Sequence, residues 1–188
     1  MVSATRCGVA VWWPEMGDPT LWGWAMTAAY GGAAIAAAWR QQGAAARPGT
    51  GAGGFWLVLA LVVGAYALNS QLDLQTLMIA TGRCLAEQAG WFELRRQVQA
   101  AVFVGFAGGS MVLLGWLAWQ MPKAGRGAGW AGAGLAAMAV FATWRAAEFL
   151  HVEGETLHAL SHMHIPRLFE LGGAAGIATG ARIGQDSG

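Results

Sequence analysis

The chain has little charge, one lysine and two cysteines. Charged residues make up 11% of its 188 residues, against roughly 25% in soluble globular domains. The formal net charge of +1 excludes the strongly basic surface with which proteins bind a nucleic-acid backbone. Lys123 lies in a predicted loop, so the sequence offers no intramembrane lysine to carry retinal. We therefore predict neither a nucleic-acid partner nor a retinal cofactor.

The short motifs of common enzymes are also absent. Cys7 and Cys84 form no C-x-x-C metal motif, and they can pair only if both face an oxidising compartment. We expect both to behave as small hydrophobic residues. The sequence contains no Walker-type loop, no nucleophile elbow and no G-x-G-x-x-G between a strand and a helix. It thus assigns no catalytic residue and leaves open whether the protein is an enzyme.

Apolar residues, glycine and tryptophan are abundant instead. Hydrophobic residues account for 56% of the chain, which also contains 29 glycines and 11 tryptophans. A soluble protein of this length cannot bury so much apolar material, and glycine and tryptophan are common in or beside membrane helices. We predict an all-α integral membrane protein with a single membrane domain over residues 1–188, located in a bacterial inner membrane.

Five apolar segments approach the roughly 20 residues that a membrane-spanning helix needs. The predicted transmembrane segments lie near residues 19–39, 55–68, 98–121, 128–150 and 168–181. The last has 14 residues and contains Glu170, so it either crosses with the help of flanking residues or is half inserted against its neighbours. Because Met16 precedes the first long apolar segment, residues 1–15 are either disordered or a misannotated start.

A further helix is predicted over residues 74–89, between the second and third spans. Its apolar side chains recur at helical spacing, at Leu74, Leu77, Met78, Leu85 and Phe92. Asp73 fits an N-cap and Gly90 fits a helix stop. We expect an amphipathic helix lying in the membrane interface, the alternative being an ordinary surface loop.

The charges of the predicted loops indicate an orientation. The first and third loops contain Arg40, Arg47, Lys123 and Arg126 and no acid, which favours the cytoplasmic side. Five arginines lie on the opposite side, so the count of basic residues alone does not decide the orientation. All acids except Asp186 fall on that opposite side of a five-span chain. We predict the N-terminus outside and the C-terminus inside.

Glycines and tryptophans suggest how the helices pack. Glycines four residues apart occur at Gly172, Gly176 and Gly180, and again at Gly105 and Gly109. Such spacing lets helix backbones approach closely in lipid, either within one bundle or against another membrane subunit. Tryptophans near the segment ends suit anchoring at the membrane interface: Trp22, Trp24, Trp39, Trp56, Trp91, Trp116, Trp119, Trp130 and Trp144.

One stretch gathers groups that bind metal ions or protons. Carboxylates and imidazoles follow one another at intervals of 3, 4, 3 and 4 residues, at Glu148, His151, Glu155, His158 and His162. On an unbroken helix they share an arc of about 80° and a stripe roughly 21 Å long. A helix from residue 128 to residue 164 would be about 55 Å long, so the stripe would leave the membrane or bend along its surface.

These five residues are our predicted metal ligands. Each E-x-x-H pair, and the i, i+4 pair His158 and His162, brings two ligand atoms onto one ion. Their nitrogen and oxygen donors suit zinc, iron, manganese or copper(II). Because one helix rarely supplies a complete ligand set, the remainder would come from a second protomer or from the acids Asp73, Glu87, Glu93 and Glu170.

Other interpretations of the stripe remain open. It fits a solvated helix face with Glu–His hydrogen bonds, or a proton-handling site in which imidazoles titrate near neutral pH. Arg145 and Glu148, three residues apart at the membrane boundary, fit a structural ion pair. All four histidines lie between positions 151 and 164, which excludes a haem clamped between histidines of two membrane helices.

Two functions follow as hypotheses. In the first, a small polytopic membrane protein carries a Glu/His metal-binding or proton-handling site at its non-cytoplasmic face, for metal handling or redox chemistry. In the second, the chain is a non-catalytic accessory or assembly subunit of a larger membrane complex. Its partners are the lipid bilayer in both cases, together with further copies of itself or other membrane subunits.

Overall fold

The described part of the chain is entirely helical. The computed structural model describes residues 19–46, 52–72, 74–90, 92–149 and 165–183. The elements are α2 (Leu21–Ala45), α3 (Ala52–Leu72), α4 (Leu74–Gln88), the short 3-10 helix η1 (Phe92–Leu94), α5 (Arg95–Ala124), α6 (Ala128–Phe149) and α8 (Ile165–Ile183). The predicted all-α class is therefore confirmed for these residues, which contain no strand.

Local sequence signals explain several of the helix ends. Thr20 caps α2, because its hydroxyl accepts a hydrogen bond of 3.2 Å from the Gly23 amide. After α4, Gly90 has a φ of 73°, the left-handed conformation in which glycine commonly stops a helix. Gly125 and Gly127, with φ values of 84° and 87°, make the turn between α5 and α6.

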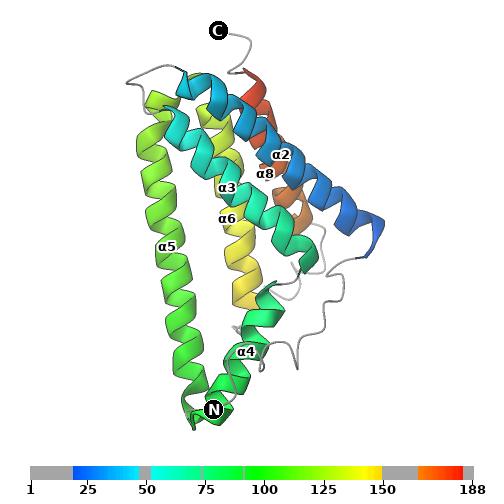
Figure 1. Cartoon of the computed structure of the whole chain (residues 1–188), viewed down its shortest axis with the longest axis vertical. Coiled ribbons are helices and arrows are strands. Elements are labelled where there is room, and N and C mark those ends of the chain that lie inside the picture. The colour runs from blue at the N-terminus through cyan, green and yellow to red at the C-terminus, as the bar shows by residue number, and fades with distance from the viewer. Residues whose placement is uncertain (1–18, 47–51, 73, 91, 150–164, 184–188) are drawn as a thin grey trace.

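Two helix pairs form the bundle. α2 packs along α3, α6 packs along α8, and contacts between α2 and α8 join the two pairs. α5 reaches α3 and α6 near its C-terminal end and diverges from the bundle toward its N-terminal end, where η1 and α4 lie (Figure 1). The α5–α6 turn and the C-terminal end of α8 thus lie at one end of the molecule, and α4 lies at the other.

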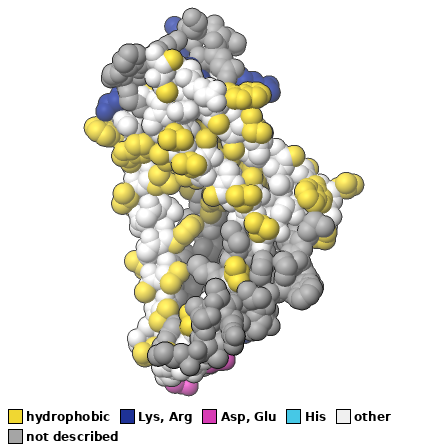
Figure 2. All heavy atoms as spheres, viewed as in Figure 1, with side chains coloured by type: hydrophobic (Ala, Val, Ile, Leu, Met, Phe, Trp, Pro, Cys, Tyr) yellow, Lys and Arg dark blue, Asp and Glu magenta, His cyan; other side chains and the backbone are white. Residues whose placement is uncertain are grey.

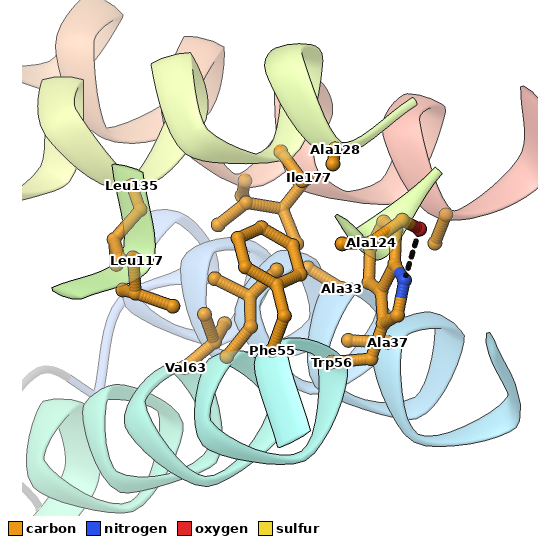
Figure 3. Close-up of a cluster of buried hydrophobic side chains, with 14 of the residues drawn as sticks. Ala33, Ala37, Phe55, Trp56, Val63, Leu117, Ala124, Ala128, Leu135 and Ile177 are labelled. Carbon is orange, nitrogen blue, oxygen red and sulfur yellow. Dashed lines mark hydrogen bonds between the residues drawn. The ribbon is translucent and has the colours of Figure 1, made fainter. Parts of the chain in front are cut away.

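The core lies where these helices converge. Phe55 and Trp56 of α3 are fully buried and meet edge to face, with ring centroids 5.1 Å apart. Leu117 of α5 and Ile177 of α8 reach the same cluster from the other helices (Figure 3). Trp56 donates its indole N–H to the carbonyl oxygen of Ala124 at 3.3 Å. The prediction that Trp56 is an interfacial anchor is therefore wrong.

Arg40 also differs from the prediction, which placed it in the first loop. α2 continues past it to Ala45, and Arg40 is only 7% exposed. Its guanidinium lies over the Trp56 ring, 5.9 Å from the ring centroid, within the range of a cation–π interaction. The Trp56 indole face thus helps to stabilise this cation inside the bundle.

Glycines on both helices form the seam between α6 and α8. A Cβ added at Gly173 would lie 2.8 Å from the carbonyl oxygen of Gly134, and one added at Gly176 would lie 3.2 Å from the Gly134 Cα. One added at Gly180 would lie 2.8 Å from the Ala131 amide nitrogen. The backbones therefore approach too closely for any side chain here, and two of the predicted α8 glycines, Gly176 and Gly180, serve packing within the bundle.

Among the described residues, two helices are long and apolar enough to cross a membrane, judged by length and composition: α3, and α5 from Ala100 to Ala124. α6 has a shorter apolar stretch, Ala128–Thr143. Large hydrophobic side chains lie exposed over the sides of the molecule (Figure 2). In this view, Lys and Arg side chains are visible at the end with the α5–α6 turn, and Asp and Glu side chains are visible at the opposite end. The exposed Arg83 of α4 also lies toward that opposite end.

Candidate functional site

A carboxylate lies inside the bundle where three helices meet. Glu170 is in the second turn of α8, and its side chain is partly buried. The hydroxyl of Tyr30, a residue of α2 that is 1% exposed, donates a hydrogen bond to Oε1 of Glu170. A carboxylate in a low-dielectric environment needs such a donor, because burial without one is costly.

Tyr66 of α3 completes this junction. Its ring is partly buried and lies 6.0 Å, centroid to centroid, from the Tyr30 ring at an interplanar angle of 51°. This tilted arrangement is a favourable one for two aromatic rings. The Glu170 carboxylate is thus held by a hydroxyl from α2, and the ring that bears this hydroxyl is held by α3.

A second group of polar side chains lies one helical turn away. Thr27 is three residues before Tyr30 on α2, and Ser70 is four residues after Tyr66 on α3, so each pair shares a helix face. The Thr27 and Ser70 hydroxyl oxygens are 2.8 Å apart. Gln71 donates from Nε2 to Thr27 Oγ1 at 2.9 Å. We call these residues together the polar cluster: Thr27, Tyr30, Tyr66, Ser70, Gln71 and Glu170.

The remaining hydrogen bonds of the cluster go to helix backbone. Thr27 donates to the Gly23 carbonyl at 2.9 Å, and Ser70 has a contact of 2.8 Å with the Ala67 carbonyl. Oε1 of Gln71 is a buried acceptor that receives no hydrogen bond from the described residues. The cluster therefore joins α2 to α3 and α8 by polar contacts, and Gln71 Oε1 is its one buried acceptor without a donor among the described residues.

The predicted Glu/His stripe falls mainly outside the described residues. Glu148 lies in the last turn of α6, but the side chains of Glu148 and Arg145 are not among those described. His151, Glu155, His158 and His162 fall within residues 150–164, which lie outside the described part. The metal centre and the Arg145–Glu148 ion pair therefore stay predictions.

The four additional candidate ligands are distributed differently. Glu170 belongs to the polar cluster, whereas Glu87 on α4 and Glu93 on η1 are exposed at the acidic end of the molecule. Asp73 lies outside the described residues. Within the described ranges, no three His, Cys, Asp or Glu side chains come together in a way that could hold a metal ion.

Cys84 corrects another expectation. It lies on α4 and is disulfide-bonded, so it is not the free small hydrophobe that we predicted. Gln88, one helical turn further on, donates from Nε2 to Cys84 Sγ at 3.4 Å. Cys7, the other cysteine of the sequence, lies outside the described residues.

A shallow depression between α6 and α8 has a volume of about 200 Å³ and is lined by no side chain that could bind an ion. It is lined by Ala137, Leu168, Phe169 and Gly172. These residues supply no polar side chain, although Phe169 adjoins Glu170 in the sequence. The depression fits an apolar chain better than it fits an ion.

Sequence reasoning found Glu170 but missed Tyr30, which donates a hydrogen bond to it, and the rest of the polar cluster. The available signal was the helical spacing of hydroxyl-bearing residues inside two apolar segments, Thr27 with Tyr30 and Tyr66 with Ser70. Polar groups that share one face of a membrane helix usually point into a bundle. Comparison of the chain with known protein families, with curated proteins and with solved structures finds no match.

Proposed function

We propose that the protein is a small polytopic membrane protein that handles a cation, a metal ion or a proton, at its acid-rich membrane face. The carrying observation is the Glu170–Tyr30 hydrogen bond inside the bundle. An ionisable side chain within an apolar helix bundle is costly and usually functional. Glu170 also follows His162, the last residue of the predicted Glu/His stripe, by eight residues, so it would connect the stripe with the interior of the bundle.

The membrane arrangement is part of this proposal. α2, α3, α5, α6 and α8 would be the five spans, and α4, with its apolar face, would lie in the interface. Lys123 in the last turn of α5 and Arg126 in the α5–α6 turn support a cytoplasmic location for this end. The disulfide at Cys84 supports the opposite, oxidising side for α4. The N-terminus would then be outside and the C-terminus inside, in a bacterial inner membrane.

The residues of the stripe define the chemistry we propose. Glu148, His151, Glu155, His158 and His162 would supply oxygen and nitrogen donors suited to zinc, iron, manganese or copper(II). Glu170, held by Tyr30, would add a carboxylate from the polar cluster. Without a metal, the same imidazoles and carboxylates would pass protons between the aqueous face and the polar cluster.

Metal content tests the metal form of the proposal. We expect stoichiometric metal in detergent-purified protein, and its loss in the double variant His158→Ala/His162→Ala. His164→Ala is the matched control, because residue 164 projects away from the stripe on a helix and should leave the metal content unchanged. Absence of metal from the wild-type protein would leave only the proton-handling form, which pH-dependent proton uptake by reconstituted vesicles would then test.

A second function is favoured by the exposure of α5. In its most apolar stretch only 6% of the residues are buried within the bundle, and nothing lies within 4 Å of a Cβ added at Gly105 or Gly109. We propose as the alternative an accessory subunit that uses this face of α5 to contact another membrane protein. Co-purification of a defined set of membrane subunits, lost on Gly109→Leu, would support it over the first proposal.

A further inference from the structure

Three arginines from separate parts of the chain lie at the end of the bundle opposite the polar cluster. Arg40 belongs to α2, Arg126 to the α5–α6 turn and Arg182 to the last turn of α8. Arg40 Nη2 is 3.8 Å from the position that a Cβ would take on Gly125, directly before Arg126. Arg40 is buried, whereas Arg126 and Arg182 are exposed, and we call these two exposed residues the arginine corner.

A backbone contact brings the turn that contains Arg126 against the end of α8, which contains Arg182. Gly127, which follows Arg126, touches Gly180, which precedes Arg182 by two residues, so closely that neither has room for a side chain. Gly125 and Gly127 on either side of Arg126 both have positive φ values, 84° and 87°. These glycines allow the turn to lie against the end of α8, and Arg126 and Arg182 remain exposed there.

The surroundings of the corner are basic at the tip and apolar below it. The fourth cation at this end, Lys123, lies over the exposed Trp119 ring, 3.7 Å from its centroid. Trp39 and Trp130, 64% and 62% exposed, flank the same end. Among the described residues, Asp and Glu are confined to other parts of the bundle, and the exposed ones lie at the far end (Figure 2).

We propose that the arginine corner binds the phosphate of an anionic phospholipid headgroup. Guanidinium groups form bidentate, charge-assisted hydrogen bonds with phosphate oxygens. A lipid fits better than a free phosphate because exposed tryptophans and apolar helix faces adjoin the corner, where acyl chains would lie. This inference rests on the membrane-spanning arrangement proposed above, and it is independent of the Glu/His centre.

Native mass spectrometry of the full chain in a neutral detergent tests the site, with phosphatidylglycerol and phosphatidylcholine as probes. We expect the wild type to bind phosphatidylglycerol more tightly than phosphatidylcholine. In the double variant Arg126→Gln/Arg182→Gln, the apparent Kd for phosphatidylglycerol should rise by about fivefold for each arginine removed. Arg83→Gln is the control, since it removes an exposed arginine from α4 at the other end and should leave the Kd unchanged.

The proposal is overturned if Arg126→Gln/Arg182→Gln binds phosphatidylglycerol as the wild type does, or if Arg83→Gln weakens binding equally. Competition by millimolar inorganic phosphate would identify a free-anion site and would also overturn it. If the double variant does not fold, we would use Arg126→Lys/Arg182→Lys in its place and measure how wild-type binding depends on salt concentration. Wild-type binding that does not change with salt would refute the proposal. A protein that needs no detergent would instead refute the membrane arrangement itself.

Discussion

α8 and α5 both carry glycines four residues apart, yet the bundle uses the two helices differently. Gly176 and Gly180 of α8 lie against the backbone of α6, whereas Gly105 and Gly109 of α5 have nothing within 4 Å of an added Cβ. α8 is also held by the hydrogen bond that Tyr30 of α2 donates to Glu170. α5 meets the bundle mainly near its C-terminal end (Figure 1).

The difference is that a second helix faces the glycines of α8, whereas none of the described residues packs against those of α5. α6 brings Gly134 to the seam, and the α5–α6 turn brings Gly127, so backbone meets backbone on both sides. In α5 the glycines face away from the described residues. Glycine spacing therefore shows that close approach is sterically possible, and a second helix with its own small residues determines whether it occurs.

Filling the seam should cause the largest effect. A Cβ at Gly134 would lie 3.0 Å from the Ile177 amide nitrogen, so Gly134→Leu must push α6 and α8 apart. We expect a loss of about 3 kcal/mol or failure to fold, measured by denaturant unfolding in detergent. Gly129→Leu is the control on the same helix, because an added Cβ there meets nothing within 4 Å. Equal stability of the two variants would contradict the seam.

Weakening the attachment of α5 to the bundle should have the second-largest effect. Trp56→Phe removes the indole N–H that reaches the Ala124 carbonyl at the end of α5 and leaves a small void in the core. We expect a loss of about 2 kcal/mol and faster amide exchange in the last turn of α5. Trp119→Phe, at an exposed position of α5, should change neither quantity. Unchanged exchange in Trp56→Phe would mean that α5 is held by other contacts.

The polar link between α8 and α2 should contribute less. Tyr30→Phe removes the donor to Glu170 and should lower the free energy of unfolding by about 1 kcal/mol, the usual range for hydrogen bonds between membrane helices. Tyr66→Phe is the matched control, because the Tyr66 hydroxyl makes no hydrogen bond within the described part of the chain. A larger loss in Tyr66→Phe would contradict the assigned donor.

The smallest effect is expected on the open face of α5. Gly109→Leu should leave the free energy of unfolding unchanged, because an added side chain enters open space. Size-exclusion chromatography with light scattering then reports the oligomeric state. A variant that loses stability, or dissociates from a larger species, would show that this face of α5 packs against a partner.

Sequence patterns identified the helices more fully than the contacts between them. The periodicity of residues 74–89 and the stop at Gly90 correspond to α4, because both depend on neighbouring residues. The burial of Arg40 and Trp56 depends on α2, α3 and α5 meeting at one place, which no local pattern encodes. Tyr30 was missed for the same reason, since its partner Glu170 is 140 residues away.

All the proposals depend on the bundle crossing a membrane with its acid-rich end and its arginine corner on opposite sides. Labelling with a membrane-impermeant maleimide tests this directly, using Glu87→Cys and Arg126→Cys, each in a Cys7→Ser/Cys84→Ser background that retains its helical circular dichroism. We predict that in sealed right-side-out vesicles residue 87 is labelled and residue 126 is protected, with the reverse in inverted vesicles. Labelling of both residues from the same side would contradict the account.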